Sequence, residues 1–143
     1  MAALSFKGSF VDRILDGTKT QTIRNYRKYP LRVGETLYLY YGLRTKNSKK
    51  LKDATCKAIY HIIIDKDSVL IFYRGAELTQ PSEGGGTKAQ LAGERVAKVI
   101  KTQKELDEFA YADGFENWAT MKRWWSLTHG DDCFPFTGQL IMW

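Results

Sequence analysis

Short apolar runs, broken by glycine, proline and charged residues, dominate this chain. Runs rich in Val, Ile, Leu and Tyr are typical of strands, and alternation of apolar with polar positions indicates a strand with one buried face. The predicted strands cover residues 2–6, 18–24, 36–41, 54–64, 68–73, 95–100 and 137–143, with a helix as the alternative for residues 95–100. The short polar segment 65–67 between two of them predicts a hairpin.

Three other segments carry the apolar spacing and end signals of helices. The predicted helices cover residues 9–15, 103–112 and 117–127. The first follows Ser9, a capping residue type, and ends before Gly17, which suits a left-handed end position. The second starts with the capping-box pair Thr102 and Glu105, and the third starts at Asn117.

The order of these elements shows no strand–helix alternation, which favours an α+β fold over a doubly wound sheet. We expect a mostly antiparallel, barrel-like sheet flanked by short helices. The length of 143 residues suits one domain, covering residues 1–143. No apolar run is long enough for a membrane helix, and the two cysteines, Cys56 and Cys133, make no disulfide framework. These features predict a soluble cytoplasmic protein without a membrane partner.

Charge is distributed unevenly along the chain. Residues 1–57 hold 13 Lys and Arg against 4 acidic residues, whereas the remaining residues carry a small net negative charge within a total of +6. Such an asymmetry indicates a surface that meets an anionic partner. Nucleic acid is the leading candidate, because each neutralised phosphate releases condensed counterions. The alternatives are a basic adaptor for an acidic protein and a solvated face with no partner.

Two clusters of cations stand within the basic half. The first holds Lys19, Arg24, Arg27, Lys28 and Arg32, and the second holds Arg44, Lys46, Lys49, Lys50 and Lys52. The second cluster predicts an exposed basic loop over residues 42–53, which have almost nothing to bury. Tyr38 and Tyr40 share one face of the strand between the clusters. Cations beside aromatic platforms suit single-stranded RNA, although the tyrosines can instead pack in the core.

The last predicted helix adds two candidate contacts for a nucleic acid. Trp118, Met121 and Trp125 form one apolar stripe, which is typical of a core face. Trp124 falls off this stripe and is expected to border a cleft. Ser126 offers a hydroxyl to phosphate, or else caps the helix end locally.

The segment 17–24 combines a helix-ending glycine with a lysine, threonine hydroxyls and an arginine. The purely structural interpretation of this segment is a helix end followed by a strand whose polar residues point outward. In a regular strand Lys19 and Thr22 project from opposite faces, so they share a site only if Lys19 lies in the turn or a bulge intervenes.

Gly17, Lys19, Thr22 and Arg24 match the pattern G-x-K-x-x-T-x-R, and this segment resembles the activating signal cointegrator homology (ASCH) family of the PUA-like superfamily. The flanking segments 10–16 and 33–35, and the late Asp113-Gly-Phe element, are similar to other parts of that family. The resemblance implies a β-barrel flanked by helices, with a cleft between them that receives RNA or a nucleotide.

The resemblance also implies activities. Family members are associated with RNA binding and in some cases RNA cleavage, and a bacterial subgroup hydrolyses the amide of N4-acetylcytidine. Motif matching assigns the catalytic lysine and threonine to Lys19 and Thr22, and the carboxylate to Asp113, with Glu116 as the alternative. We expect an RNA-binding protein with hydrolytic processing of RNA or a nucleoside. An N4-acetylcytidine amidohydrolase and a binding module without catalysis are the alternatives.

Metal-binding patterns are weak. His129, Asp131, Asp132 and Cys133 lack the paired spacing of a zinc site. We therefore expect no cofactor and no dedicated metal site, with Mg²⁺ involved only if the protein cleaves RNA. A ribonuclease built on two histidines needs both His61 and His129 in one site.

Overall fold

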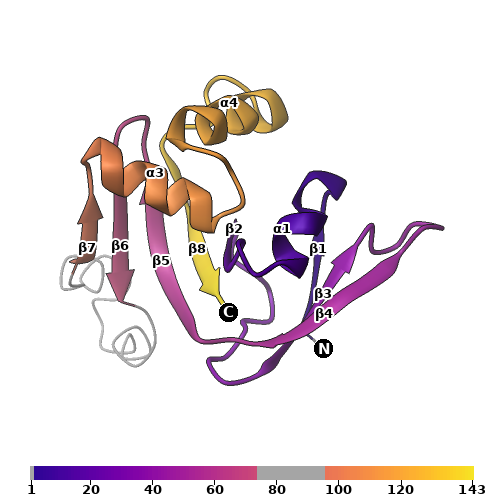
Figure 1. The fold of residues 1–143 in the computed structure, drawn as a ribbon. Coiled ribbons are helices and arrows are strands. Elements are labelled where there is room, and N and C mark those ends of the chain that lie inside the picture. Colours follow the sequence, from indigo (N-terminus) through magenta and orange to yellow (C-terminus); the bar gives the residue numbers. More distant parts are fainter. Residues whose placement is uncertain (1, 74–95) are drawn as a thin grey trace.

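The computed structural model describes residues 2–73 and 96–143, which form an α+β arrangement of two sheets and three α-helices (Figure 1). The described elements, in chain order, are β1 (Ala3–Phe6), a 3₁₀ turn (Gly8–Phe10), α1 (Val11–Leu15), β2 (Gln21–Arg24), β3 (Thr36–Tyr41), β4 (Lys49–Thr55), β5 (Ala58–Ile64), β6 (Val69–Tyr73), β7 (Val96–Ile100), α3 (Gln103–Ala112), α4 (Trp118–His129) and β8 (Phe136–Met142). Among these residues no helix is long and apolar enough to cross a membrane.

The strands are hydrogen-bonded into two separate sheets. The larger sheet has the order β2-β8-β5-β6-β7 and is antiparallel throughout. The smaller has the order β1-β3-β4, in which β1 runs parallel to β3 and β4 runs antiparallel to it. The predicted closed barrel is not found among the described strands. Where β1 and β2 approach each other, the Arg24 guanidinium donates to the Ser5 carbonyl at 2.7 Å, so a side chain bridges the two sheets there.

The predicted basic loop over residues 42–53 is only partly correct. Its second half belongs to β4, which pairs with β3, and the connection between them shortens to residues 42–48. A register shift between Leu39 and Tyr40 inserts an extra residue into β4, and Leu51 packs against the core. Pairing with β3 satisfies backbone groups that a loop exposes to water, so lysine-rich residues form a strand despite their low β-propensity.

The single strand predicted over residues 54–64 is divided at Cys56. The amide of Cys56 donates to the Glu35 carbonyl at 2.9 Å, and its own carbonyl accepts from Gly34 at 2.7 Å. Lys57 then donates to Met142 of the last strand. These bonds carry the chain from the small sheet, where β4 ends, to the large sheet, where β5 begins.

Most predicted helix signals agree with the structure. The capping box between Thr102 and Glu105 is formed at the start of α3, and the Asn117 side chain accepts from the Thr120 amide at the start of α4. The latter helix runs two residues further than predicted, to His129. The expected cap by Ser9 is not formed, because a 3₁₀ turn precedes α1 and no side chain caps either of them.

The core lies between the sheets and the helices that cover them. Its fully buried aliphatic members include Leu4, Ile14, Leu37, Leu39, Ile62, Ile64, Leu140 and Ile141. Figure 1 shows α3 crossing the large sheet and α4 above it, while α1 lies between that sheet and the β3–β4 hairpin. The turn after α1 and the start of β2 are thereby brought beside the end of α3, where Thr20 donates to the Ala112 carbonyl at 2.9 Å.

Candidate functional site

A cavity of about 220 Å³ opens where the two sheets and α4 meet. Its lining residues are Ser5, Phe6, Lys7, Phe10, Lys19, Thr22, Ile23, Arg24, Asp113, Phe115, Trp124, Trp125 and His129. The polar members include most of the motif that the sequence pattern singled out. They come from segments about ninety residues apart in the chain, which the contact between β2 and the end of α3 brings together.

Lys19 lies in the turn before β2, not in the strand itself. Its amide donates to the Arg13 carbonyl at 2.9 Å, and β2 begins only at Gln21. Lys19 and Thr22 are therefore not forced onto opposite faces of one strand, and their side chains line the same cavity. Lys19 is 2% exposed and Thr22 is 6% exposed.

The Lys19 ammonium is held from several sides. It donates to the main-chain carbonyl of Gln21 at 2.8 Å and to the main-chain carbonyl of Asp113. The Asp113 carboxylate oxygen Oδ1 lies 3.9 Å from Nζ, at the outer limit of an ion pair. The rings of Phe10 and Phe6 also face the ammonium, with centroids 4.7 and 5.6 Å away. A cation over aromatic rings is stabilised by their negative faces.

Gln21 links the two charged groups. Its carbonyl accepts from Lys19, while its side-chain Nε2 donates to Asp113 Oδ1 over 3.5 Å. It is 3% exposed and lines a different cavity of about 410 Å³, together with residues of α3 and the large sheet. Gln21 therefore contacts the Asp113 carboxyl and also lines this larger cavity.

Arg24 supplies a second, half-buried cation at the far end of the motif. Its Nε donates to Thr22 Oγ1 at 3.3 Å, and its Nη2 donates to the Ser5 carbonyl. The guanidinium carbon lies 4.8 Å from the centroid of Phe6. Thr22 thus receives a hydrogen bond from a cation and keeps its own hydroxyl proton to donate.

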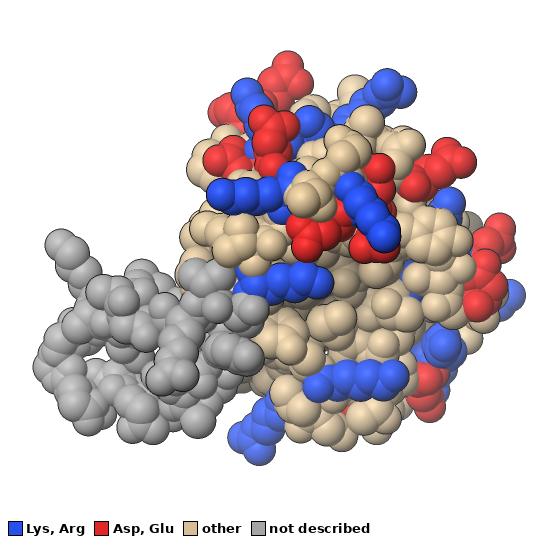
Figure 2. All heavy atoms as spheres, turned by 60° about the vertical axis from the view of Figure 1, so that its left-hand side comes forward, with Lys and Arg blue, Asp and Glu red and all other residues tan. Residues whose placement is uncertain are grey.

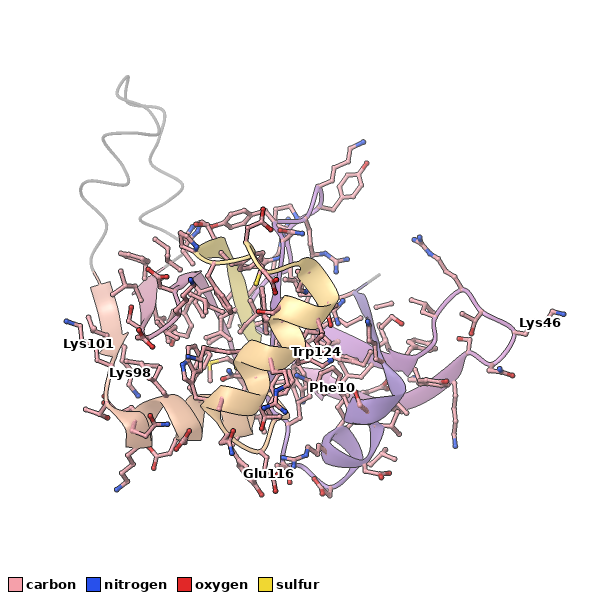
Figure 3. The ribbon with its side chains drawn as sticks, turned by 90° about the horizontal axis from the view of Figure 1, so that it is seen from above. Phe10, Lys46, Lys98, Lys101, Glu116 and Trp124 are labelled. Carbon is pink, nitrogen blue, oxygen red and sulfur yellow. The ribbon has the colours of Figure 1, made fainter. Side chains whose placement is uncertain are left out.

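Aromatic rings form the wall opposite these polar groups. Phe10, Phe115 and Trp124 contact one another pairwise, with ring centroids 5.4–5.5 Å apart. The Lys7 ammonium lies 5.5 Å from the Trp124 ring. Figure 3 shows Phe10 and Trp124 adjacent at the centre of the molecule. Aromatic walls beside a few fixed polar groups are typical of small-ligand sites.

Burial changes the proton affinities of the three charged groups. Desolvation lowers the pKa of Lys19 to about 8, opposed by the Asp113 charge. Desolvation raises the pKa of Asp113 to about 6, opposed by Lys19 and by the Gln21 hydrogen bond. Desolvation, followed by repulsion from Arg27, lowers the pKa of Arg24 to about 10. Burial in low dielectric disfavours the charged form of each group, so a lysine and an aspartate here titrate closer to neutrality than usual.

Gly114 packs against Lys19 and Phe10 and has a positive φ, so both its conformation and its lack of a side chain matter here. Its φ is +100°, and an added Cβ would lie 2.9 Å from both Lys19 Cδ and Phe10 Cδ1. Gly114→Ala combines left-handed strain with overpacking, so we expect a loss of about 2–4 kcal/mol in the free energy of unfolding, measured by denaturant titration. Gly34→Ala is the matched control, because Gly34 has φ +97° but open space around it. The control should lose only about 1 kcal/mol, and equal losses would contradict the proposed crowding.

The remaining predicted residues lie outside the cavity. Glu116 is exposed, and Figure 3 shows it pointing away from Phe10 and Trp124, which leaves Asp113 as the carboxylate in the cavity. Ser126 is half-buried and does not line the cavity. The other predicted nucleic-acid contacts absent from the cavity lining are Arg27, Lys28, Arg32, Tyr40, Arg44, Lys46, Lys49 and Lys50.

Two further candidates from the sequence are separated by the fold. His129 lines the cavity, but His61 lies on β5 and its Nδ1 is hydrogen-bonded to the Tyr26 hydroxyl. The two histidines therefore do not form one site. Over residues 2–73 and 96–143, no three His, Cys, Asp or Glu side chains gather into a group that could hold a metal ion.

Several residues that line the cavity or contact its charged groups were not predicted from the sequence. Gln21 has the polar character of an outward strand position, and Phe6, Phe10 and Phe115 have the character of core residues. Two of these residues could have been found from their positions in the sequence. Phe10 lies in the segment just before the motif, and Phe115 directly follows Asp113-Gly114. Comparison of the chain with family models, curated proteins and solved structures gave no match. The chemical interpretation of the site therefore depends on its geometry and on the motif.

Proposed function

We propose that this protein is an ASCH-like hydrolase that receives a base of RNA, or of a nucleoside, in the cavity and cleaves an amide on that base. N4-acetylcytidine is the substrate that we favour, with acetate and cytidine as products. The single observation that carries the proposal is the burial of Lys19, Thr22 and Asp113 around one aromatic-walled cavity. The resemblance of the motif to the ASCH family supports the same assignment.

Two features favour amide hydrolysis over cleavage of the RNA chain. A cavity of about 220 Å³ is smaller than the roughly 300–1,000 Å³ of sites for drug-sized ligands, which suits a single base. The separation of His61 from His129 argues against a histidine-pair ribonuclease, because both general acid and general base must reach one phosphodiester.

The proposed reaction has two steps. The Thr22 oxygen attacks the acyl carbon, its proton passes to neutral Lys19, and Asp113 gives its proton to the departing amine as the C–N bond breaks. Water then attacks the acyl-threonine, giving a proton to Asp113, and Lys19 returns its proton to the Thr22 oxygen. The Arg24 guanidinium beside Thr22 stabilises negative charge that develops on the reacting oxygens.

This mechanism requires that Lys19 and Asp113 together hold one proton. Below pH 6 both groups are protonated and no base is present, whereas above pH 8 the pair has lost both protons and no acid is present. We therefore expect a bell-shaped plot of kcat/KM against pH, with limbs near these two values and a maximum between them. The plot is measured from initial rates of acetate release. A rate that keeps rising well above the upper limb would contradict the role of Asp113 as the acid.

The direct test of the function is incubation of the protein with N4-acetylcytidine, with acetate and cytidine both quantified. Labelled RNA without the modification is incubated in parallel, with and without Mg²⁺. Release of acetate and cytidine in equal amounts, with intact RNA, supports amide hydrolysis. Shortened RNA and no acetate would replace the proposal with the ribonuclease alternative.

A second candidate is a binding module without catalysis. It is favoured by the two main-chain carbonyls that accept from Lys19, because such contacts stabilise the charged form of the lysine. In that case Lys19 and Arg24 act as fixed cations for a nucleotide. Tight binding of N4-acetylcytidine with no acetate release at any pH would support this candidate.

A further inference from the structure

The β3–β4 hairpin, with its turn at residues 42–48, is the basic arm of this molecule. Arm residues 42–55 hold five cations and one acidic residue. The cations are Arg44, Lys46, Lys49, Lys50 and Lys52, and the acid is Asp53. Asp53 forms an ion pair with Lys50 at 2.7 Å, so it neutralises only one of them. Figures 1 and 3 show the arm reaching away from the large sheet, with Lys46 at its far end.

Aromatic rings accompany the cations on one face of the arm. In β3, Leu37 and Leu39 are buried, whereas Tyr38 and Tyr40 are half-buried on the opposite face. Tyr40 pairs with Lys50 across the hairpin, and the Lys50 ammonium lies 5.0 Å from the Tyr38 ring. Residues two apart in a strand are about 6.7 Å apart. The arm therefore presents two spaced rings bordered by cations, which matches bases and phosphates of a single strand.

The arm is joined to the cavity through β1, near the point where β3 ends and the turn begins. Ser5 lines the cavity and its carbonyl accepts from Arg24, while its hydroxyl accepts from the Leu43 amide in the turn of the arm at 3.0 Å. Phe6, which also lines the cavity, is paired with Tyr41 at the end of β3. A ligand that extends from the cavity thus reaches the basic arm without crossing the body of the molecule.

The arm differs in charge from another face of the protein. Figure 2 shows the side that carries β7, β6 and α3, where Lys and Arg are mixed with Asp and Glu over its upper part. The mixture of signs over that upper part contrasts with the excess of cations on the arm. An alternative role for lysines on an edge strand is to discourage pairing with strands of other chains. If that is their only role, substitutions in the arm should not change the binding or hydrolysis of RNA.

We propose that the basic arm binds the phosphates of a single-stranded RNA whose modified base occupies the cavity, so that the substrate is a polynucleotide and not a free nucleoside. This inference rests on the proposed amide hydrolysis. Binding energy from parts of a substrate remote from the reacting bond raises kcat/KM, and the free nucleoside lacks those parts. The free nucleoside is then expected to be hydrolysed poorly, and without a strong dependence on salt.

The test compares two substrates and two variants. The substrates are free N4-acetylcytidine and a short oligoribonucleotide that carries one N4-acetylcytidine. The arm variant is R44N/K46Q, in which asparagine tolerates the positive φ of Arg44. The control variant, K101Q/K104Q, removes the same charge from exposed residues, and Figure 3 shows Lys101 on the side of the molecule away from Lys46. Thermal unfolding checks that both variants remain folded.

For the oligonucleotide, R44N/K46Q should lower kcat/KM about 25-fold at about 0.1 M salt, as for two lost phosphate contacts. The slope of log kcat/KM against the logarithm of the salt concentration should become shallower by about 1.4. R44N/K46Q should hydrolyse the free nucleoside at the wild-type rate. K101Q/K104Q should match the wild type on both the oligonucleotide and the free nucleoside. Equal behaviour of the two variants on the oligonucleotide would overturn the inference. Binding of both variants to polyglutamate is measured in parallel. If R44N/K46Q loses as much affinity for polyglutamate as for the oligonucleotide, the inference is also overturned, because an acidic protein is then the partner.

The two proposals fail separately. If the wild type hydrolyses neither substrate, the amide hydrolysis is wrong, and the arm is still tested by fluorescence anisotropy with the same oligonucleotide. Weaker binding by R44N/K46Q than by K101Q/K104Q then supports the arm as an RNA-binding surface. If hydrolysis occurs but the free nucleoside is the better substrate, the proposed function stands and the inference about the arm is wrong.

Discussion

Lys19→Met is expected to reduce the turnover of N4-acetylcytidine about 1000-fold, because the variant has no group to take the proton from Thr22. Methionine has a similar length and suits the contacts that Phe6 and Phe10 make with the lysine chain. The measurement is the rate of acetate release at saturating substrate, which separates the chemical step from binding. A variant that keeps a tenth of the wild-type rate would eliminate Lys19 as the base.

Lys19→Arg distinguishes a base from a fixed cation. Arginine retains the positive charge but is not deprotonated in proteins, so it cannot accept a proton. The proposed mechanism requires that this variant be as inactive as Lys19→Met while still binding substrate. If Lys19 only holds an anion, Lys19→Arg retains both binding and whatever activity the protein has. Ligand affinity is followed by the change in intrinsic tryptophan fluorescence, because Trp124 and Trp125 both line the cavity.

Thr22→Val is expected to cause a second loss of about 1000-fold, because it removes the nucleophilic oxygen and keeps the shape of the side chain. Thr22→Ser retains the hydroxyl and should keep activity within about 10-fold of the wild type. Both changes are buried beside Arg24, whose Nε loses its acceptor only in the valine variant. Acetate release by the two variants under identical conditions measures the contribution of the hydroxyl.

A covalent intermediate gives this prediction a second readout. Acid quenching during turnover should trap an acetyl group on Thr22 in the wild type and on the serine of Thr22→Ser, detected by peptide mass spectrometry. Thr22→Val should carry no acetyl group. Normal turnover by Thr22→Val would mean that water attacks the amide directly, and the acyl-threonine step would then be wrong.

Much of the fold follows from local patterns in the sequence. The capping box at Thr102 and the apolar spacing around α4 are short-range signals, and the structure confirms them. The lysine-rich strand β4 was not predictable in this way, because its stability comes from pairing with β3 and not from its own composition. The division of the strands into two sheets likewise depends on pairings between distant segments, which no single segment encodes.

The site was predictable to a different extent for each residue. Lys19 and Thr22 stand in a short motif, and the structure brings both to one cavity because the strand starts only after Lys19. Asp113 required the resemblance, since an aspartate after a helix is usually a turn residue. Gln21 was missed because its contact with Asp113 joins residues 92 positions apart in the chain. The Asp113-Gly-Phe element already favours Asp113 over Glu116 in the sequence, and the structure adds that Asp113 is buried and Glu116 exposed.

The double role of Ser5 has a practical consequence for protein engineering. Its carbonyl anchors Arg24, and its hydroxyl anchors the first residues of the hairpin turn at Leu43. A shortened version of this protein should therefore retain the chain through Leu43 and be trimmed only between residues 44 and 48. A deletion that includes Leu43 also removes its hydrogen bond to Ser5, the residue that holds the guanidinium, so that the loss of the cationic tip can no longer be measured separately.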